Sequence, residues 1–239
     1  AAAQRAPLLR LGREIGFEML AEGASGSAFA VELAGRPFEV ELPVPGRYQA
    51  QNAALALACV DRLAGAALAA HASGARSALA GVALPGRNEL LRRAPWVVVD
   101  AAHTQGSFAA LQEMLNALPA RARHVVLSLS AGREPGSVCA PLLRNAQRIT
   151  VTRAEPTRSD EPERIAARVR EYALHTNVRV ERDPVRAIRE AYRGLGRDEL
   201  LCATGSVYMA GLARTILLEE LGLSPHFSPA RAARAWRCP

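Results

Sequence analysis

The stretch VVVDAAHTQGS, residues 97–107, indicates the fold, because a run of valines ends on an acid and a polar turn follows it. The valines are typical of a buried strand, and a helical pattern begins after the turn. Four further short apolar runs follow, separated by amphipathic stretches, at residues 123–130, 148–152, 177–181 and 199–205. This alternation predicts a mostly parallel sheet with helices on both faces. We therefore expect residues 85–222 to form a doubly wound α/β domain.

The N-terminal third of the chain has a different pattern. Residues 27–44 alternate around an Ala-Gly-Arg-Pro turn and predict a hairpin, and two helical stretches follow it. The second helical stretch ends at Pro85-Gly86, a pair that is typical of a domain boundary. We expect a first domain over residues 1–84, a second over 85–222, and a mobile Pro- and Arg-rich tail over 223–239.

The composition narrows the classes of protein that the chain can belong to. Apolar residues make up 49% of the sequence, and no apolar run reaches the ~18 residues that span a bilayer. We therefore expect a cytoplasmic protein without membrane contact. The net charge is +7, but the arginines are spread along the chain and only 5% of residues are aromatic, which does not favour nucleic-acid binding. The sequence contains no lysine, so lysine-dependent chemistry on this chain is excluded.

The four cysteines do not form a metal-binding or redox motif. They are Cys59, Cys139, Cys202 and Cys238, with no Cys-x-x-Cys pair among them. The first three lie in apolar surroundings, so we expect buried free thiols and no zinc site.

Polar residues follow the predicted strands at the edge where open α/β sheets bind ligands, beyond the carboxyl ends. Asp100 and His103 follow the first strand, Arg158 lies in the segment after the third, and Ser206 comes after the last. A carboxylate at this edge can accept ribose hydroxyls, and an arginine can hold a phosphate or a carboxylate. Backbone N–H groups at a helix start can bind an anion.

Each of these residues also has an ordinary structural interpretation. Asp100 could cap the next helix, and His103 could be a loop histidine without a ligand. Arg158 could be a solvated surface charge, and Thr204-Gly205-Ser206 could be a tight turn. The order and spacing of the residues therefore carry more weight than any one of them.

That order resembles a known family. GRYQAQNAALALA, LPGRNE, VVVDAAHTQGS and LLCATGSVYMAGLAR occur in the order found in the second half of folylpolyglutamate synthase/dihydrofolate synthase. These enzymes belong to the Mur ligase superfamily of ATP-dependent amide-bond-forming enzymes, and the resemblance covers residues 3–221. It implies a Rossmann-like Mur ligase C-terminal domain, preceded by the remnant of an α/β central ATPase domain.

The resemblance also implies roles for particular residues. Gln49 and Asn52 would contact the adenine of ATP, and Arg87 would reach its phosphates. Asp100 would hold the ribose, with His103 beside it in the nucleotide cleft. The incoming amino acid, glutamate, would be bound by Arg158 and Ser206.

The implied reaction is ligation through an acyl phosphate. ATP would phosphorylate the carboxylate of a folate or a dihydropteroate, and the amine of glutamate would then attack it. The family's P-loop lysine and its Mg²⁺ ligands lie in an N-terminal half that this sequence does not contain, so we expect no metal ligands here and no activity from this chain alone. The N-terminal half of the same protein is then the expected partner, and a monomer is the expected state.

Two alternatives remain open at this point. DAAHT and EPTRSDEP are also similar to peptidoglycan-building Mur ligases, so the chain could be a fragment of one, although TGSVYMAG favours the folate branch. It could also be a non-catalytic nucleotide-binding or interaction module with the same fold.

Overall fold

The computed structural model describes residues 7–64 and 72–226 and divides the chain into two compact units. Of the described residues, those up to Ala83 form the first unit and those from Leu84 onward form the second, and each unit is described by itself. Residues 227–239 of the predicted tail lie outside the described residues. At the start of that tail, Leu223 still belongs to the second unit, because its N–H donates to the Leu218 carbonyl and its side chain packs against the core.

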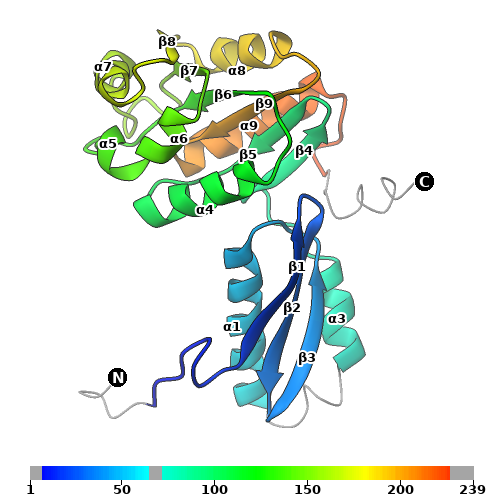
Figure 1. Cartoon of the computed structure of the whole chain (residues 1–239). Helices are drawn as coiled ribbons and strands as arrows, with labels where there is room; N and C mark the ends of the chain where they lie inside the picture. Colours follow the sequence, from blue (N-terminus) through cyan, green and yellow to red (C-terminus); the bar gives the residue numbers. More distant parts are fainter. Residues whose placement is uncertain (1–6, 65–71, 227–239) are drawn as a thin grey trace. The chain divides into compact units, whose positions relative to one another are not determined.

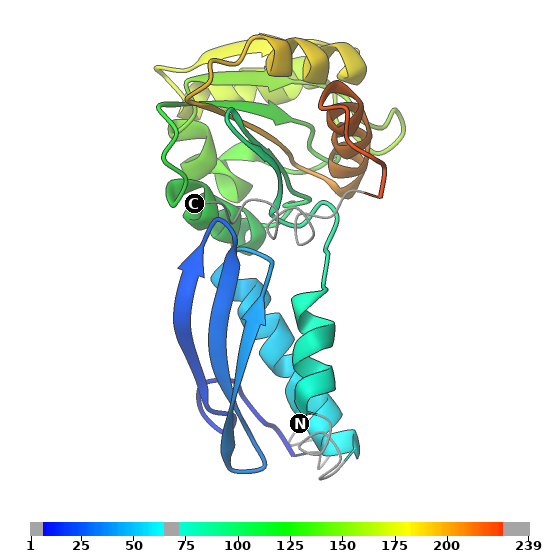
Figure 2. The same ribbon diagram turned by 90° about the vertical axis from the view of Figure 1, so that its right-hand side faces the viewer.

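The first unit is a three-stranded antiparallel sheet with two helices on one face. The strands are β1 (Phe17–Gly23), β2 (Gly26–Leu33) and β3 (Arg36–Leu42), and the helices are α1 (Arg47–Ala64) and α3 (Ala72–Ala80). Figure 2 shows both helices on the same side of the sheet. Alternate residues of β2 and β3, such as Phe29 and Val40, are buried beneath them. The predicted hairpin is confirmed, with Ala34 and Gly35 of its turn at positive φ.

The second unit is a six-stranded sheet in the order β4-β5-β9-β6-β7-β8. Its strands are β4 (Glu89–Arg93), β5 (Trp96–Val99), β6 (Ala122–Leu127), β7 (Arg148–Val151), β8 (Asn177–Val180) and β9 (Glu199–Thr204). All neighbouring strands pair in parallel except β4, which pairs antiparallel with β5. The predicted doubly wound, mostly parallel sheet is confirmed.

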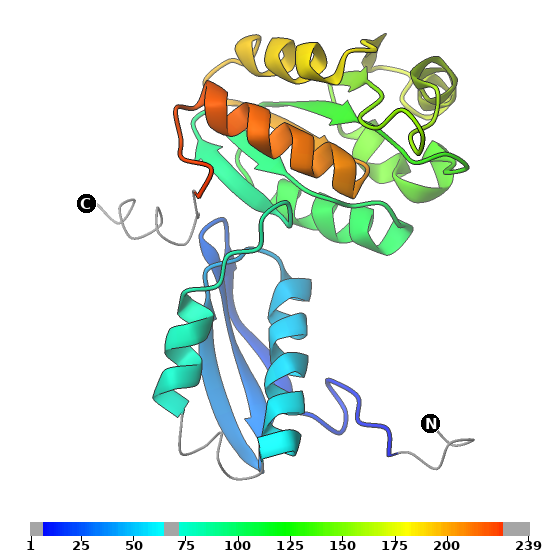
Figure 3. The same cartoon turned by 180° about the vertical axis from the view of Figure 1, so that it is seen from behind.

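Helices cover both faces of this sheet. On one face lie α4 (Gln105–Asn116), α5 (Pro135–Val138), α6 (Ala140–Arg144) and α7 (Pro162–Tyr172), which are in front of the strands in Figure 1. On the other face lie α8 (Pro184–Arg193) and α9 (Val207–Glu220), which Figure 3 shows from behind. Val97, Val99 and Ala203 point to α8 and α9 and form the core on that side. This switch of helices between faces occurs beside β9, the position where doubly wound sheets place ligands.

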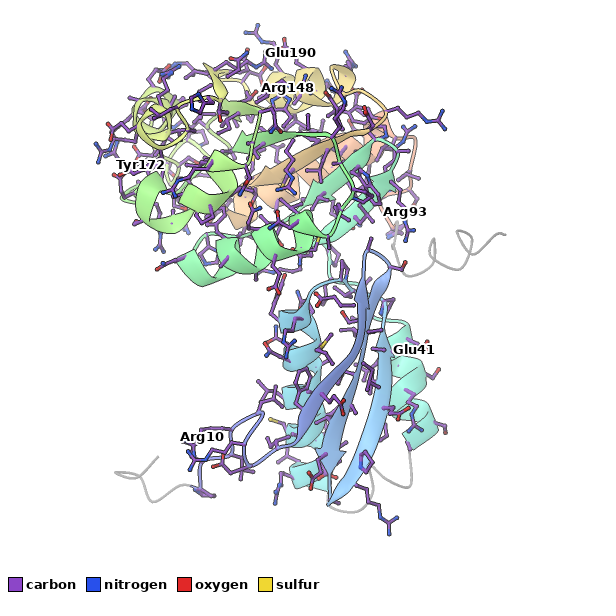
Figure 4. The ribbon with its side chains drawn as sticks, in the orientation of Figure 1. Arg10, Glu41, Arg93, Arg148, Tyr172 and Glu190 are labelled. Atoms are coloured by element: carbon purple, nitrogen blue, oxygen red, sulfur yellow. The ribbon has the colours of Figure 1, made fainter. Side chains whose placement is uncertain are left out.

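The structure departs from a simple alternation of strands and helices at two places. Between β6 and β7 lie two short helices, α5 and α6, and Pro141, which has no N–H to donate, lies in the first turn of α6. The strand β4 was not predicted, because three of its five residues are charged. Its last residue, Arg93, is labelled in Figure 4. β4 covers the edge of β5 that the parallel strands leave unpaired.

Candidate functional site at the carboxyl edge of the sheet

The carboxyl ends of β5, β9 and β6 meet at one edge of the second unit. The N–H of Asp100 donates to the Ala203 carbonyl at 3.1 Å, and the N–H of Ser128 donates to the Thr204 carbonyl at 3.1 Å. A side chain on Gly205 would place its Cβ 2.5 Å from the Ser128 carbonyl oxygen, so glycine allows the two strand ends to approach. Residues that are far apart in the sequence are therefore brought together here.

Asp100 is buried and accepts two backbone hydrogen bonds. Its Oδ2 accepts from the N–H of Asn88 and its Oδ1 from the N–H of Ala102, each at 2.7 Å. Burial raises the pKa of the Asp100 carboxyl above its ordinary value, while the two N–H groups and the charge of Arg87 act in the opposite direction. Asp100 does not cap α4, whose N-cap is Thr104 in a reciprocal capping box with Ser107.

Arg87 is presented by a tight turn next to Asp100. The N–H of Arg87 donates to the Leu84 carbonyl at 3.1 Å, with Pro85 and Gly86 at the two central positions and Gly86 at φ +67°. This is the pattern of a type II turn, which needs positive φ at its third residue. The side chain of Arg87 is exposed and forms no ion pair with the part of the chain that the structure describes.

His103 is half-buried and has a defined tautomer. Its Nδ1 lies 2.9 Å from the Ala101 carbonyl oxygen. Because a carbonyl oxygen can only accept, Nδ1 carries the proton, and Nε2 of the neutral ring is left as an acceptor. The backbone N–H of His103 donates to Ser107 Oγ at 3.0 Å, which fixes the residue just before α4.

Arg158 extends from a loop that two buried serines tie to the end of β6. Ser128 Oγ accepts from the N–H of Ala154 at 3.0 Å and donates to Ser159 Oγ at 3.2 Å. The Arg158 carbonyl accepts from the N–H of Ala131 at 2.8 Å, so the loop and the extension of β6 are joined on both sides. These contacts hold the backbone of Arg158 while its side chain remains exposed.

The side chain of Arg158 reaches the start of α9. Its guanidinium carbon lies 5.6 Å from the centre of the Tyr208 ring, within the range of a cation–π contact. Ser206 is the N-cap of α9, and its hydroxyl accepts from the N–H of Met209 at 3.1 Å. Arg158 and Ser206 are therefore near the same helix start. Sequence reasoning missed Tyr208, Ser128 and Ser159; the Ser-x-Tyr after β9 was the only local signal for any of them.

Gln49 and Asn52 lie in the first unit, in the first two turns of α1. Gln49 is buried and Asn52 is exposed, and Asn52 Nδ2 lies 3.4 Å from Gln49 Oε1. The structure thus pairs these two residues with each other. It groups Arg87, Asp100 and His103 at the end of β5, and Arg158 with Ser206 at the start of α9.

The thiols differ in their burial. Cys139 and Cys202 are buried as expected, and burial raises the pKa of both, that of Cys139 to about 12. Cys59 is exposed on α1, so the expectation of a buried thiol there was wrong. Within residues 7–64 and 72–226, no cluster of three or more His, Cys, Asp and Glu side chains is placed to hold a metal ion. None of the helices in the described segments is long and apolar enough to cross a membrane.

Comparison with known proteins identifies relatives along most of the chain. Residues 86–207 match the family described as Mur ligase, glutamate ligase domain. The dihydrofolate synthase/folylpolyglutamate synthase of Mycobacterium tuberculosis is 30% identical over 200 residues, which cover 77% of this chain and 41% of that protein. The chain therefore spans less than half the length of this relative.

Solved structures agree with this assignment. Mycobacterium tuberculosis folylpolyglutamate synthase complexed with ADP matches with a TM-score of 0.75 and 30% identity, over 84% of this chain and 47% of that one. Escherichia coli FolC in complex with ADP matches with a TM-score of 0.74 over 92% of this chain and 51% of that one, and at 22% identity it shows the shared fold. The resemblance found in the sequence is confirmed, and the chain belongs to the Mur ligase family, with its glutamate ligase domain at residues 86–207.

Proposed function

We propose that this chain is the amino-acid-binding and nucleotide-covering part of an ATP-dependent ligase that adds glutamate to the carboxylate of a folate or a dihydropteroate. The observation that carries the proposal is the carboxyl edge of the second unit, where Arg87, Asp100 and His103 lie together and Arg158 lies beside the start of α9. The similarity to folylpolyglutamate synthases, one of them solved with ADP, supports it. This similarity favours the folate branch over a peptidoglycan-type ligase or a non-catalytic module.

The residues proposed to contact the nucleotide lie at the carboxyl edge of the second unit and, separately, on α1 of the first. Arg87, exposed and without an ion pair among the described residues, suits the phosphates of ATP. His103 offers Nε2 as an acceptor beside it. Asp100 would take the ribose, and because each of its oxygens already accepts one N–H, only the second lone pair of each remains for a sugar hydroxyl. Gln49 and Asn52 would contact the adenine from α1.

The amino acid would bind at the start of α9. The Arg158 guanidinium forms no ion pair with the described residues, although the Glu155 carboxylate is near enough to interact with its charge, and it lies over the Tyr208 ring. A guanidinium can bind the side-chain carboxylate of glutamate through two parallel hydrogen bonds. The partial positive charge at the start of the 14-residue helix α9, whose N-cap is Ser206, adds to this attraction.

The reaction divides between this chain and a segment outside its sequence. The family's phosphate cradle and Mg²⁺ site need a lysine and metal ligands, and the chain contains neither a lysine nor, in its described residues, a metal-binding cluster. When bound, Mg²⁺ would neutralise charge on the transferring phosphoryl group. The residues of this chain would orient ATP and glutamate and exclude water from the acyl phosphate. We expect the chain alone to be inactive, and the complete protein to be a cytoplasmic monomer.

Steady-state kinetics of the complete protein test this division. With ATP, a reduced folate and glutamate, Arg158→Ala should raise KM for glutamate about tenfold or more and leave KM for ATP unchanged. Arg87→Ala should instead weaken the binding of ATP and raise KM for ATP. Arg197→Ala, an exposed arginine before β9, is the matched control and should resemble the wild type. An unchanged KM for glutamate in Arg158→Ala would remove that residue from the amino-acid site.

A further inference from the structure

We propose that Glu89 and Arg214 are positioning residues for Arg87, and that together with Asp100 they fix the turn that presents the Arg87 guanidinium. The inference rests on the proposed function for the role of Arg87 toward ATP. The contacts themselves are independent of the proposed function. The inference adds two residues to the site that are not expected to touch either substrate.

The first support is a buried carboxylate that binds the N–H of the residue before Arg87. Glu89 Oε2 accepts from the N–H of Gly86 at 2.8 Å, and Glu89 is only 3% exposed. The N–H that it holds belongs to the peptide between Pro85 and Gly86, which is the central peptide of the turn. A type II turn depends on the orientation of that peptide, so Glu89 stabilises the conformation that places Arg87 at the end of the turn.

The second support is the ion pair that keeps Glu89 in place. Arg214 Nε lies 3.0 Å from Oε1 and 2.9 Å from Oε2 of Glu89, and the Arg214 side chain is mostly buried. Arg214 comes from α9, 125 residues further along the chain. A buried carboxylate is tolerated only when a charge and hydrogen bonds compensate for its lost hydration. Arg214 supplies the charge, and it also ties the turn to α9.

The third support is the pair of hydrogen bonds that join the residues on both sides of Arg87 to the end of β5. The N–H of Asn88 donates to Asp100 Oδ2, and the N–H of Ala101 donates to the Gly86 carbonyl at 2.9 Å. Both residues that flank Arg87 are therefore bonded to the end of β5 or to Glu89. Gly86 also packs closely on α9, since a Cβ added to it would lie 3.3 Å from that of Ala210.

These contacts hold the backbone on both sides of Arg87 and leave its side chain in solvent. The backbone is held at Gly86 and Asn88 by two buried carboxylates, whereas the guanidinium is exposed and free of ion pairs within the described residues. Holding a binding group in one geometry before the ligand arrives lowers the entropy lost on binding. Loss of the Glu89 contact should therefore reduce the contribution of Arg87 to ATP binding, although the charge of Arg87 is retained.

Amide hydrogen exchange tests the contacts without any substrate. In Glu89→Gln, which has nearly the same shape, the Gly86 amide should lose protection by about tenfold or more, since a hydrogen bond to a charged acceptor is replaced by a neutral one. Arg214→Lys should give a smaller loss at the same amide. Glu219→Gln, which removes an exposed partner of Arg189 on α9, is the matched control and should leave Gly86 unchanged. Wild-type protection of Gly86 in Glu89→Gln would overturn the inference.

A double-mutant cycle tests whether Glu89 acts through Arg87. In the complete protein, Glu89→Gln and Arg87→Ala should each raise the Kd for ATP, and the double variant should be within about twofold of Arg87→Ala alone. Effects that multiply would mean that Glu89 acts on ATP by another route and would overturn the inference. If Arg87→Ala leaves ATP binding unchanged, the proposed function of Arg87 fails, and hydrogen exchange at Gly86 still decides whether the two residues fix the turn.

Discussion

Replacing His124 by glutamine should remove an acid sensitivity that this residue gives to the second unit. His124 is 5% exposed at the start of β6, and its Nε2 lies 2.8 Å from Thr150 Oγ1. Burial lowers the pKa of His124 from 6.5 to about 4, and the positive charges of Arg148 and Arg179 act in the same direction. Arg148 and Glu190, which pairs with Arg179, are labelled in Figure 4. The neutral ring is therefore strongly preferred in the folded protein.

The sign and size of the effect follow from the two pKa values of His124. Between pH 6.5 and about pH 4, the unfolded chain binds a proton that the folded chain does not, so the free energy of unfolding falls as the pH falls through this range. Above pH 6.5 the residue has no pH-dependent effect. At ~1.4 kcal/mol per pH unit, the loss is about 2 kcal/mol at pH 5 and approaches about 3 kcal/mol near pH 4.

Urea unfolding at pH 7.5 and pH 5 measures this loss. The wild type should lose about 2 kcal/mol more than His124→Gln between the two pH values. His175→Gln, which changes an exposed histidine, is the matched control and should follow the wild type. An NMR titration of the His124 ring provides a direct check. A midpoint near pH 6.5, or the same pH dependence in wild type and His124→Gln, would refute the reasoning.

Substitutions at three positions test the packing and the caps around the site by urea unfolding. Gly205→Ala should destabilise by about 3 kcal/mol or more, because its Cβ would lie 2.5 Å from the Ser128 carbonyl oxygen; stability equal to the wild type would disprove that contact. Gly211→Ala, in α9 with nothing within 4 Å of the added Cβ, should instead stabilise by about 0.5–1 kcal/mol, and a loss would show an unseen clash. Thr104→Ala should lower the free energy of unfolding by about 1 kcal/mol, because it removes the N-cap of α4. Thr104→Ser keeps a capping hydroxyl and should retain most of that stability.

The fold was predictable because its signals are local. Short valine-rich runs separated by amphipathic stretches have the periods of strands and helices, and the Pro-Gly pair has the chemistry of the turn that it forms. β4 escaped prediction because Arg92 and Arg93 follow only two leucines, which is a weak strand signal. It becomes a strand by pairing with β5, and the periodicity of its own sequence does not specify that pairing.

The candidate site was predictable only as a set of positions. The rule that ligands bind at the carboxyl edge selected Asp100, His103, Arg158 and Ser206 without their partners. The partners come from distant parts of the chain: Glu89 pairs with Arg214 across 125 residues, and Ser128 bonds Ser159 across 31. No local pattern specifies such pairs, because they depend on how strands and helices are ordered in space.

Isotope transfer during turnover of the complete protein tests the central claim most directly. The folate or dihydropteroate carboxylate is labelled with ¹⁸O, and the released phosphate is analysed by mass spectrometry after incubation with ATP and glutamate. Ligation through an acyl phosphate predicts glutamate-dependent ADP release and transfer of one ¹⁸O from the carboxylate to each phosphate. Phosphate without the label, or ADP release that does not depend on glutamate, would contradict the account.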